Sequence, residues 1–278
     1  MKVRNGMILT AIVSNQILSF ALFENGGAED VRMPMATVRL AAQPMRTTDE
    51  YAALLDAMLS QKNANADVKI SMIASVVPSL TEVVTAAIRQ LYPDSVCLSV
   101  GAGLRTGFTI RTDAPGELGA DLVALTSGAL TLCEPPFLVL DRGAVTTLSA
   151  VGKGKAAPEF LGCAILPGPT LCAEALKLYA AQLPNVSLQH PASAIGTNTG
   201  DSMRAGLMMG GMAAIEGLVQ AFCDEMKAEK LPLIVTGEGA EEIARRMAAR
   251  CDAHLAHRGL CRLALLNARK SGNPPKRG

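Results

Sequence analysis

The sequence predicts an α/β protein in which one strand-and-helix unit is duplicated, with a cleft between the two halves. Short apolar runs alternate with amphipathic runs of helical length along the 278 residues. The order strand, turn, strand, strand, helix begins near residue 7 and begins again near residue 136. We therefore expect an N-terminal domain over residues 1–134, a C-terminal domain over residues 135–269, and a flexible tail at residues 270–278.

The N-terminal apolar run, Met7–Phe23, has two interpretations. Two basic residues precede the run, as they do in a secretory signal peptide. The polar triplet Ser14-Asn15-Gln16 interrupts the run at its centre, which favours a hairpin of two strands, Met7–Val13 and Ile17–Phe23. We favour the hairpin, and we expect that no other stretch has the length and apolarity of a membrane-spanning helix.

The remaining elements follow from apolar periodicity and from capping residues. In the first half we expect strands at Thr37–Leu40, Val68–Val77 and Val96–Val100. Its helices are expected at Tyr51–Leu59 with Thr47 or Thr48 as the cap, from the cap Ser79 to Tyr92, and from Gly119-Ala120-Asp121 to Cys133. In the second half we expect strands at Pro136–Leu140, Val145–Val151, Phe160–Leu166 and Leu231–Val235. Its helices are expected at Thr170–Gln182, Asp201–Lys227 and Ala240–Arg250.

Composition argues against several classes of function. The chain has 26 basic and 25 acidic residues, so its charge does not favour nucleic acid or an anionic membrane as a partner. Aromatic residues make up 3% of the chain, and there is no Trp to form a stacking platform for single-stranded nucleic acid. The seven cysteines form no CxxC pair and the chain has three histidines, which argues against a disulfide framework or a zinc site. We expect reduced thiols and a cytoplasmic protein.

Two aspartates lie where an α/β sheet gathers ligands. Asp141 ends an apolar strand just before Gly143, and Asp121 follows Gly119-Ala120 at the start of a helix. A carboxylate in either place can hold a cation or orient a hydroxyl group. The competing interpretations are a helix N-cap for Asp121 and a turn residue for Asp141, and spacing alone favours these.

A polar loop, Gly196–Gly200, leads into the long helix expected at Asp201–Lys227. Free backbone N–H groups at this helix start would suit an anion or a carboxylate, but the same residues could simply cap the helix. Inside the helix, Gly206 and Gly210 lie on one face, although each interior glycine costs about 1 kcal/mol relative to alanine. We expect them to allow a close backbone approach, either within the chain or across a dimer.

Seven motifs occur in order along the chain. They are Arg46-Thr-Thr-Asp-Glu-Tyr51, Ser75-Val-Val-Pro78, Pro115-Gly-Glu-Leu-Gly-Ala-Asp121, Leu140-Asp-Arg-Gly-Ala-Val-Thr-Thr147, Leu161-Gly-Cys-Ala-Ile-Leu-Pro-Gly168, Gly196-Thr-Asn-Thr199 with Ser202-Met-Arg-Ala-Gly206, and Val235-Thr-Gly237. Each motif is modest by itself. Together, in this order and at this spacing, they resemble the type III pantothenate kinase family, which has an actin-like, sugar-kinase-like fold.

The resemblance implies duplicated actin-like (RNase H-like) ATPase domains. It also implies transfer of phosphate from ATP to pantothenate, giving 4′-phosphopantothenate in the first step of coenzyme A biosynthesis. A homodimer, magnesium with ATP, and a monovalent cation (K⁺ or NH₄⁺) are implied in the same way. By resemblance, Asp121 is the catalytic base, and it contacts pantothenate together with Gly119, Ala120 and Thr199. By the same resemblance, Asp141 binds the monovalent cation. The residues that the resemblance places in ATP-binding turns are Asn15, Gly143, Thr146 and Gly237. Phosphoryl transfer depends mostly on positioning and charge neutralisation, and these residue types suit it.

The chain departs from the family pattern at the residues expected to meet the ATP phosphates. Ile12, Ser14, Gln16, Leu122 and Ala144 stand where the family has Asp, Gly, Thr, Arg and Thr. Isoleucine cannot ligate magnesium, and losing one electrostatic contact to a reacting phosphate costs about 3 kcal/mol. The alternative function is therefore a catalytically impaired paralogue, a pseudoenzyme with a ligand-binding or regulatory role.

Overall fold

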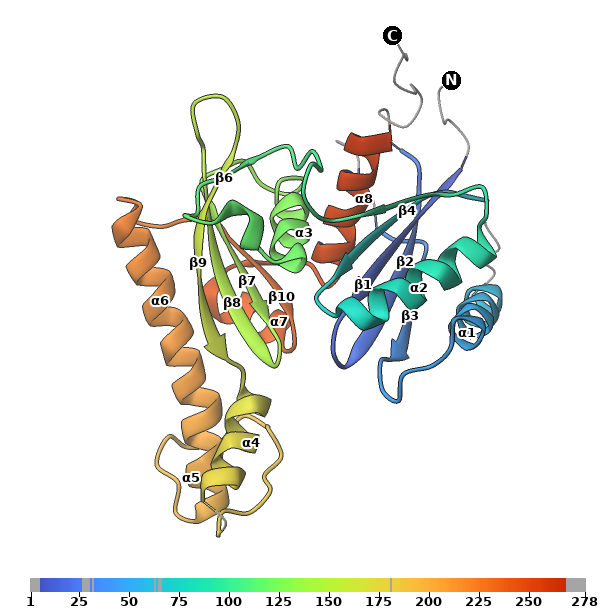
Figure 1. The fold of residues 1–278 in the computed structure, drawn as a ribbon. Helices are drawn as coiled ribbons and strands as arrows, with labels where there is room; N and C mark the ends of the chain where they lie inside the picture. The colour runs from blue at the N-terminus through green and yellow to red at the C-terminus, as the bar shows by residue number, and fades with distance from the viewer. Residues whose placement is uncertain are drawn as a thin grey trace. The chain divides into compact units, whose positions relative to one another are not determined.

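The computed structural model describes residues 6–26, 31, 33–62, 64, 67–180 and 182–268 (Figure 1). The chain divides into two compact units. The first comprises Met1–Glu134, Gly154–Glu159 and His254–Gly278, and the second comprises Pro135–Lys153 and Phe160–Ala253. The domain boundaries expected from the sequence remain a prediction, and in this division the segment from His254 lies with the first unit. The tail expected at residues 270–278 lies outside the described residues.

The first unit contains a five-stranded sheet in the order β3-β2-β1-β4-β5. The strands are β1 (Met7–Val13), β2 (Ile17–Glu24), β3 (Ala36–Ala41), β4 (Val68–Ser75) and β5 (Val96–Ser99). β1 is antiparallel to β2 and parallel to β4. Ser14 closes the β1–β2 turn, because its backbone N–H donates to Ile17 O (3.1 Å) and its Oγ accepts from Ile17 N (3.1 Å). The hairpin interpretation of the N-terminal apolar run is confirmed.

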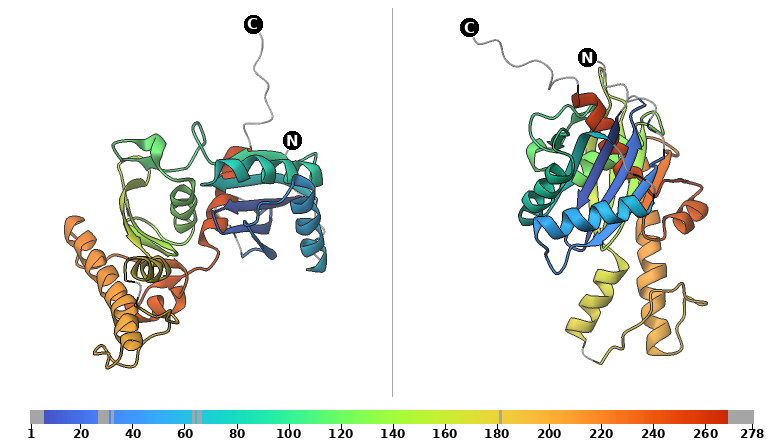
Figure 2. Two further views of the ribbon diagram at one scale, coloured as in Figure 1. Left: turned by 60° about the horizontal axis from the view of Figure 1, so that its bottom comes forward. Right: turned by 90° about the vertical axis from the view of Figure 1, so that its right-hand side faces the viewer.

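Helices cover both faces of this sheet (Figure 2). They are α1 (Thr48–Gln61), α2 (Pro78–Leu91), α3 (Ala120–Ala129) and α8 (Leu255–Asn267), and the unit also holds the short elements β6 (Thr109–Ile110) and η1 (Pro115–Glu117). Alternate β1 residues point to opposite faces. Leu9 and Ala11 join the hydrophobic cluster that contains the buried residues of α1 and α2, whereas Thr10 bonds to His257 on α8.

The starts of α1 and α2 test the expected caps. Thr47 caps α1 in a capping box, in which Glu50 N donates to Thr47 Oγ1 (3.3 Å) and Thr47 N donates to Glu50 Oε2 (2.8 Å). The expectation that Ser79 caps α2 is wrong. The N-cap is Val77, and Pro78 takes the first helical position, where the missing N–H costs nothing.

The helix α8, which the sequence did not lead us to expect, packs against α3 with the two backbones in contact. A Cβ placed on Gly259 would overlap the Ala124 carbonyl oxygen, and one on Gly128 would overlap the Leu255 carbonyl oxygen. Glycine at both positions permits this approach. α3 itself ends at Ala129, four residues before the expected end at Cys133.

The second unit repeats the topology of the first. Its strands are β7 (Phe137–Arg142), β8 (Val145–Gly152), β9 (Glu159–Pro167), β10 (Leu233–Gly237) and β11 (Arg250–Cys251). They lie in the order β11-β10-β7-β8-β9, which matches β5-β4-β1-β2-β3 element for element. β7 forms a hairpin with β8 and is parallel to β10, as β1 is with β2 and β4. The duplication expected from the sequence is therefore present in the strand order.

The helices of the second unit are α4 (Pro169–Tyr179), α5 (Thr199–Arg204), α6 (Gly211–Glu225) and α7 (Ala240–Met247). α5 continues through the π-helical segment η2 (Ala205–Gly210) into α6, giving one helix of 27 residues. By length and composition this helix could cross a membrane, so the expectation that no such stretch exists is wrong. Core helices of soluble proteins can have the same length and composition, so these two properties are weak evidence for a membrane span.

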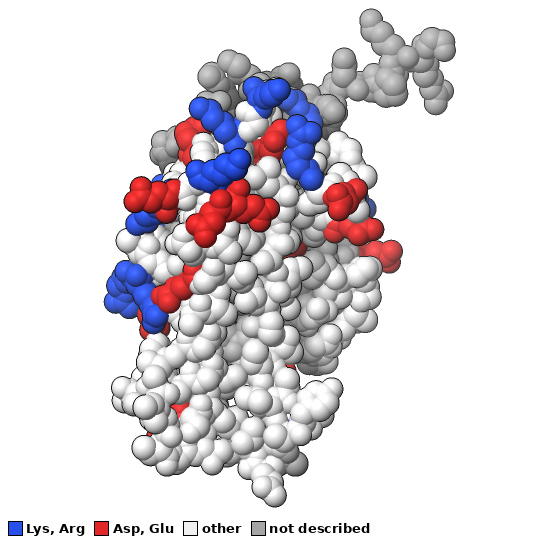
Figure 3. All heavy atoms as spheres, turned by 90° about the vertical axis from the view of Figure 1, so that its left-hand side faces the viewer, with Lys and Arg blue, Asp and Glu red and all other residues white. Residues whose placement is uncertain are grey.

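The long helix exposes small residues to open space. A Cβ placed on Gly206, Gly210 or Gly217 would have no described atom within 4 Å. Its sequence carries no charged side chain between Arg204 and Glu216, and Figure 3 shows a largely uncharged surface where the second unit carries α4 and α5. The close backbone approach expected at Gly206 and Gly210 is therefore not made to any described part of the same chain.

Candidate functional site

Asp121 lies in the first turn of α3 with its carboxylate available to a ligand. The N-cap of α3 is Gly119, so the interpretation of Asp121 as the N-cap is wrong. The carboxylate folds back over Gly119, where a Cβ would overlap Asp121 Oδ1. The residue is half-buried, and its side chain makes no hydrogen bond or ion pair with any other described residue. A carboxylate held in this way can accept a proton from a bound hydroxyl group.

The residues beside Asp121 differ in what they can offer. Gly119 and Ala120 are half-buried and leave the start of α3 without bulky side chains. Leu122, which stands where the family has arginine, is only 7% exposed and packs inside the unit. The start of α3 therefore contributes a carboxylate and no positive charge.

The β1–β2 turn does not fit a magnesium ion. Asn15 and Gln16 are exposed in this turn, and the Ser14 hydroxyl is bonded to the Ile17 carbonyl oxygen (2.8 Å). Ile12 is half-buried in β1, between Ser19 of β2 and Ala74 of β4. The turn thus offers no carboxylate, the ligand that magnesium prefers. Among the described residues, no group of three or more His, Cys, Asp or Glu side chains could hold a metal ion.

Two turns of the second unit lie side by side. Asp141 and Arg142 end β7, and they pair with Thr236 and Gly237 of the parallel neighbour β10. Gly237 has φ +89°, and a Cβ there would overlap the Arg142 carbonyl oxygen and lie 2.7 Å from Asp141 Oδ1. Glu238 N donates to the same Arg142 oxygen (2.6 Å). Ligands gather beyond the carboxyl ends of parallel strands, where these turns lie.

The β7–β8 turn is supported from a second side. Gly168 N donates to Ala144 O (2.7 Å), and a Cβ on Gly168 would overlap the Gly143 carbonyl oxygen. Thr146, at the start of β8, is 3% exposed and pairs with Arg142. The turn that contains Gly143 is therefore held between the end of β10 and the loop after β9.

The start of α5 is capped by its own side chains. Asn198 is the N-cap, and its Oδ1 accepts from Asp201 N (2.9 Å) while its Nδ2 donates to Asp201 Oδ2 (2.6 Å). Arg204 Nη2 pairs with Asp201 Oδ1 (2.5 Å). The Arg204 guanidinium and the Asn198 amide hold the pKa of Asp201 below its usual range. Of the two interpretations of this loop, the structure shows the cap, and it leaves Thr199 exposed.

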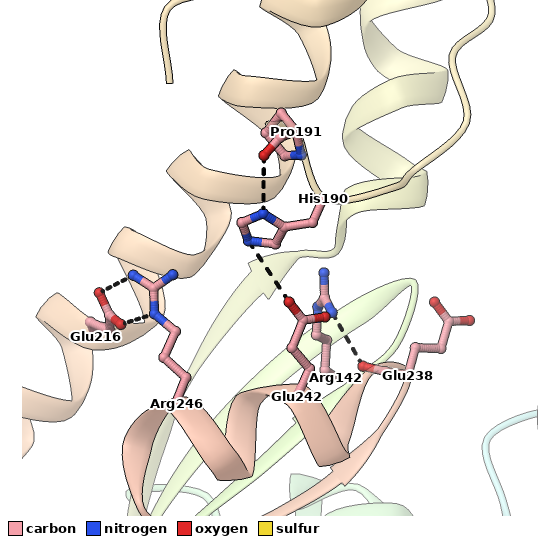
Figure 4. Close-up of polar contacts among 7 residues, drawn as sticks. All are labelled: Arg142, His190, Pro191, Glu216, Glu238, Glu242 and Arg246. Atoms are coloured by element: carbon pink, nitrogen blue, oxygen red, sulfur yellow. Dashed lines mark hydrogen bonds and ion pairs between the residues drawn. The ribbon is translucent and has the colours of Figure 1, made fainter. Parts of the chain in front are cut away.

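Two cavities open beside the turns of the second unit. The larger, of about 200 Å³, is mostly apolar and is lined by Arg142, Thr146, Leu166, Cys172, Leu207 and Ile215 among others. The apolar side chains that line the smaller cavity include Met208, Met212 and Ile243. Its polar lining consists of Arg142, His190, Glu242 and Arg246 (Figure 4). Arg142 lines both cavities.

The structure brings some of the expected site residues together. Asp141, Gly143, Thr146 and Gly237 form one group around the paired turns of the second unit. Gly119, Ala120 and Asp121 form a second group at the start of α3. Asn15 lies in the β1–β2 turn of the first unit, and Thr199 is the first residue of α5 in the second unit. The sequence analysis did not include Arg142 among the site residues. Its position between Asp141 and Gly143, at the end of an otherwise apolar strand, could have indicated a role in the site.

The duplicated strand order and the paired glycine turns define an α/β protein of the actin-like class. Solved structures share this fold. A conserved Baf-family protein of Campylobacter jejuni has a TM-score of 0.57 at 18% identity, covering 94% of this chain and 99% of its own. A 2-dehydro-3-deoxygalactonokinase candidate of Sinorhizobium meliloti has a TM-score of 0.53 at 12% identity, covering 95% of this chain and 99% of its own. These likenesses confirm the expected fold class.

The chain belongs to the type III pantothenate kinase family, whose sequence model matches residues 10–221. The type III pantothenate kinase of Acidobacterium capsulatum is 34% identical over 245 residues, which cover 86% of each chain. That of Moorella thermoacetica is 35% identical over 201 residues, which cover 72% of this chain and 77% of its own. The family expected from the seven motifs is confirmed.

Proposed function

We propose that this protein is a type III pantothenate kinase, a transferase that phosphorylates pantothenate with ATP in the first step of coenzyme A biosynthesis. The observation that carries the proposal is the half-buried carboxylate of Asp121 at the start of α3, with which no described side chain pairs. Asp121 takes the proton of the pantothenate hydroxyl, the hydroxyl oxygen attacks the γ-phosphorus, and ADP leaves. Gly119 and Ala120 contact pantothenate at the same helix start, and Thr199 contributes an exposed hydroxyl group from α5.

The turns of the second unit bind the nucleotide in this proposal. Gly143, Thr146 and Gly237 present backbone N–H groups and a hydroxyl to phosphate oxygens. Asp141, whose carboxylate lies against Gly237, binds the monovalent cation, K⁺ or NH₄⁺. Asn15 contributes from the β1–β2 turn of the first unit. Because that turn does not fit magnesium, no step of the reaction as proposed is routed through a protein-bound divalent ion.

A homodimer is the proposed assembly. The second unit exposes large apolar side chains on β9 and α4, including Ile165 (67% exposed), Leu178 (77%) and Tyr179 (87%). The open glycine face of the long helix belongs to the same unit. A second copy would cover this surface, and sedimentation equilibrium tests for it. A cytoplasmic location is proposed because a reducing compartment keeps the seven free cysteines as thiols.

A catalytically impaired paralogue is the second candidate function. The specific observations that favour it are Ile12 near the end of β1, where the family has an aspartate, and the burial of Leu122. Ile12 and Leu122 stand in place of an aspartate and an arginine, which would contact the phosphates or their metal ion. Such a protein would bind pantothenate or nucleotide and use the binding for regulation.

One experiment separates the two candidates. Purified protein is incubated with ATP, pantothenate, potassium and magnesium or manganese, and release of ADP is followed. We expect pantothenate-dependent ADP release that falls about 10²–10⁴-fold in Asp121→Asn, because the general base is lost. Asp113→Asn is the matched control, since Asp113 is an exposed aspartate of the same unit. Absence of pantothenate-dependent ADP with every metal, while pantothenate or ADP still raises the melting temperature, would favour the impaired paralogue.

A further inference from the structure

Arg142 is a half-buried arginine placed between the two turns of the second unit. It is the last residue of β7, between Asp141 and Gly143. Its guanidinium turns towards the β10–α7 turn, where Nη1 donates to Glu238 O (3.3 Å; Figure 4). Nη1 also lies 2.6 Å from the point that a Cβ on Gly239 would occupy. The side chain thus reaches from one glycine turn to the other.

The charge of Arg142 is not neutralised within the described part of the chain. A guanidinium has five N–H donors, and among the described residues this one makes a single long hydrogen bond, to a neutral carbonyl group. No described carboxylate forms an ion pair with it. Because Arg142 is only partly buried and its bond to Glu238 is exposed, the guanidinium remains accessible to an anionic ligand.

The other charged groups around the smaller cavity have partners. Arg246 binds Glu216 through two hydrogen bonds, from Nε to Oε1 (2.5 Å) and from Nη2 to Oε2 (3.1 Å). Glu242 faces His190, with Oε1 and Nε2 separated by 3.8 Å. Of the two arginines that line this cavity, Arg246 is therefore paired with a carboxylate, and Arg142 is available to bind a ligand.

We propose that Arg142 binds phosphate oxygens of the nucleotide. This inference rests on the proposed function, since it assigns a residue to the same nucleotide turns. The fork of the guanidinium matches two phosphate oxygens, and its position at both turns places it beside the groups expected to hold the polyphosphate chain. Arg142 thereby supplies a positive charge at the nucleotide turns of the second unit.

The test measures the affinity of four proteins for ADP, ATP and adenosine by calorimetry. The proteins are the wild type, Arg142→Met, Arg142→Lys and the control Arg245→Met, which removes an exposed guanidinium that lines neither cavity. We expect Arg142→Met to weaken ADP and ATP binding about 10- to 100-fold, as loss of a charge-assisted hydrogen bond does. Adenosine binding should stay within about twofold of wild type, Arg142→Lys should recover part of the ADP affinity, and Arg245→Met should match wild type.

Three outcomes would overturn the inference. An equal loss of ADP and adenosine affinity in Arg142→Met would show that Arg142 only shapes the turn. Unchanged or tighter ADP binding would show that the guanidinium is not a phosphate ligand. A wild type that binds no nucleotide would overturn both this inference and the proposed function. If the wild type binds ADP through Arg142 but does not phosphorylate pantothenate, the proposed function fails and the inference stands.

Discussion

Replacing Gly259 with alanine should destabilise the helix pair on which Asp121 depends. α3 carries Asp121 at its start, and α8 packs against α3 where Gly128 and Gly259 meet. A Cβ on Gly259 would overlap the Ala124 carbonyl oxygen and lie 2.7 Å from both Ala124 C and Gly128 N. These are backbone atoms, so no side-chain rotation relieves the overlap and the helices must move apart.

The expected magnitude follows from two opposing effects. Overpacking a close-packed site costs about 1–3 kcal/mol, and the backbone overlap here places the cost near 3 kcal/mol. Alanine recovers about 1 kcal/mol of helix propensity relative to glycine. The net loss of unfolding free energy is therefore about 2 kcal/mol, which lowers the melting temperature by about 4–8 °C at this domain size.

Thermal unfolding of Gly259→Ala beside the control Gly101→Ala is the assay. Gly101 lies in the same unit, and a Cβ there would meet nothing within 4 Å, so its replacement should leave the melting temperature unchanged or slightly higher. The reasoning about α3 and α8 is refuted if Gly259→Ala melts within about 1 °C of wild type, or if the two variants shift equally.

Three further predictions concern other parts of the chain. Burial lowers the pKa of His257 to about 3, so the unfolded chain binds a proton below pH 6.5 that the folded state does not. This group should therefore leave the unfolding free energy unaffected above pH 6.5 and lower it by about 1.4 kcal/mol per pH unit from pH 6.5 towards 5, as measured by urea titrations. His257→Asn should flatten that slope, and an unchanged slope would contradict the attribution of the slope to His257. Thr47→Ala should cost about 1 kcal/mol of stability by removing the capping box of α1, and an equal cost for Thr48→Ala would show that the box does not stabilise the helix. Gly237→Ala should weaken ADP binding at least about tenfold, because φ +89° and the Arg142 carbonyl oxygen exclude a Cβ; calorimetry with unaltered ADP affinity would contradict this.

The elements that the sequence predicts well are those whose signals are local. The polar triplet Ser14-Asn15-Gln16 marks a turn between two apolar runs, and the structure forms the hairpin there. Thr47 lies three residues before Glu50, which is the spacing of a capping box. The repeated order of strands predicts the duplication, because equivalent strands of both units occupy equivalent places in their sheets.

The helix α8 shows why other elements could not be predicted. Three of its nine buried residues, His257, Arg258 and Asn267, are polar or charged, and they interrupt the apolar pattern that is typical of a core helix. The polar atoms are satisfied by distant parts of the chain. His257 bonds to Thr10 (2.8 Å) and Ser19 (2.8 Å), Arg258 donates to the Val31 carbonyl oxygen, and Asn267 bonds to the backbone of Arg105 (2.9 and 3.0 Å). These pairings exist only in the folded unit.

The candidate site was also predictable only in part, namely where its signals are local in the sequence. The glycines and aspartates of the turns are visible as motifs, and the structure groups Asp141, Gly143, Thr146 and Gly237 around the ends of β7 and β10. The role of Asp121 was not decided by spacing, which favoured an N-cap, because the cap position depends on backbone angles at Gly119. The sequence did not predict a role for Arg142, because its hydrogen-bond partner, Glu238, is 96 residues away in the sequence.

Direct detection of the product tests the central claim most plainly. Wild-type protein and Asp121→Asn are incubated with ATP, pantothenate, potassium and magnesium, and phosphorylated pantothenate is measured by mass spectrometry alongside ADP. The account predicts one phosphopantothenate for each ADP with the wild type and almost none with Asp121→Asn. ADP formed without phosphopantothenate, or full product from Asp121→Asn, would contradict it.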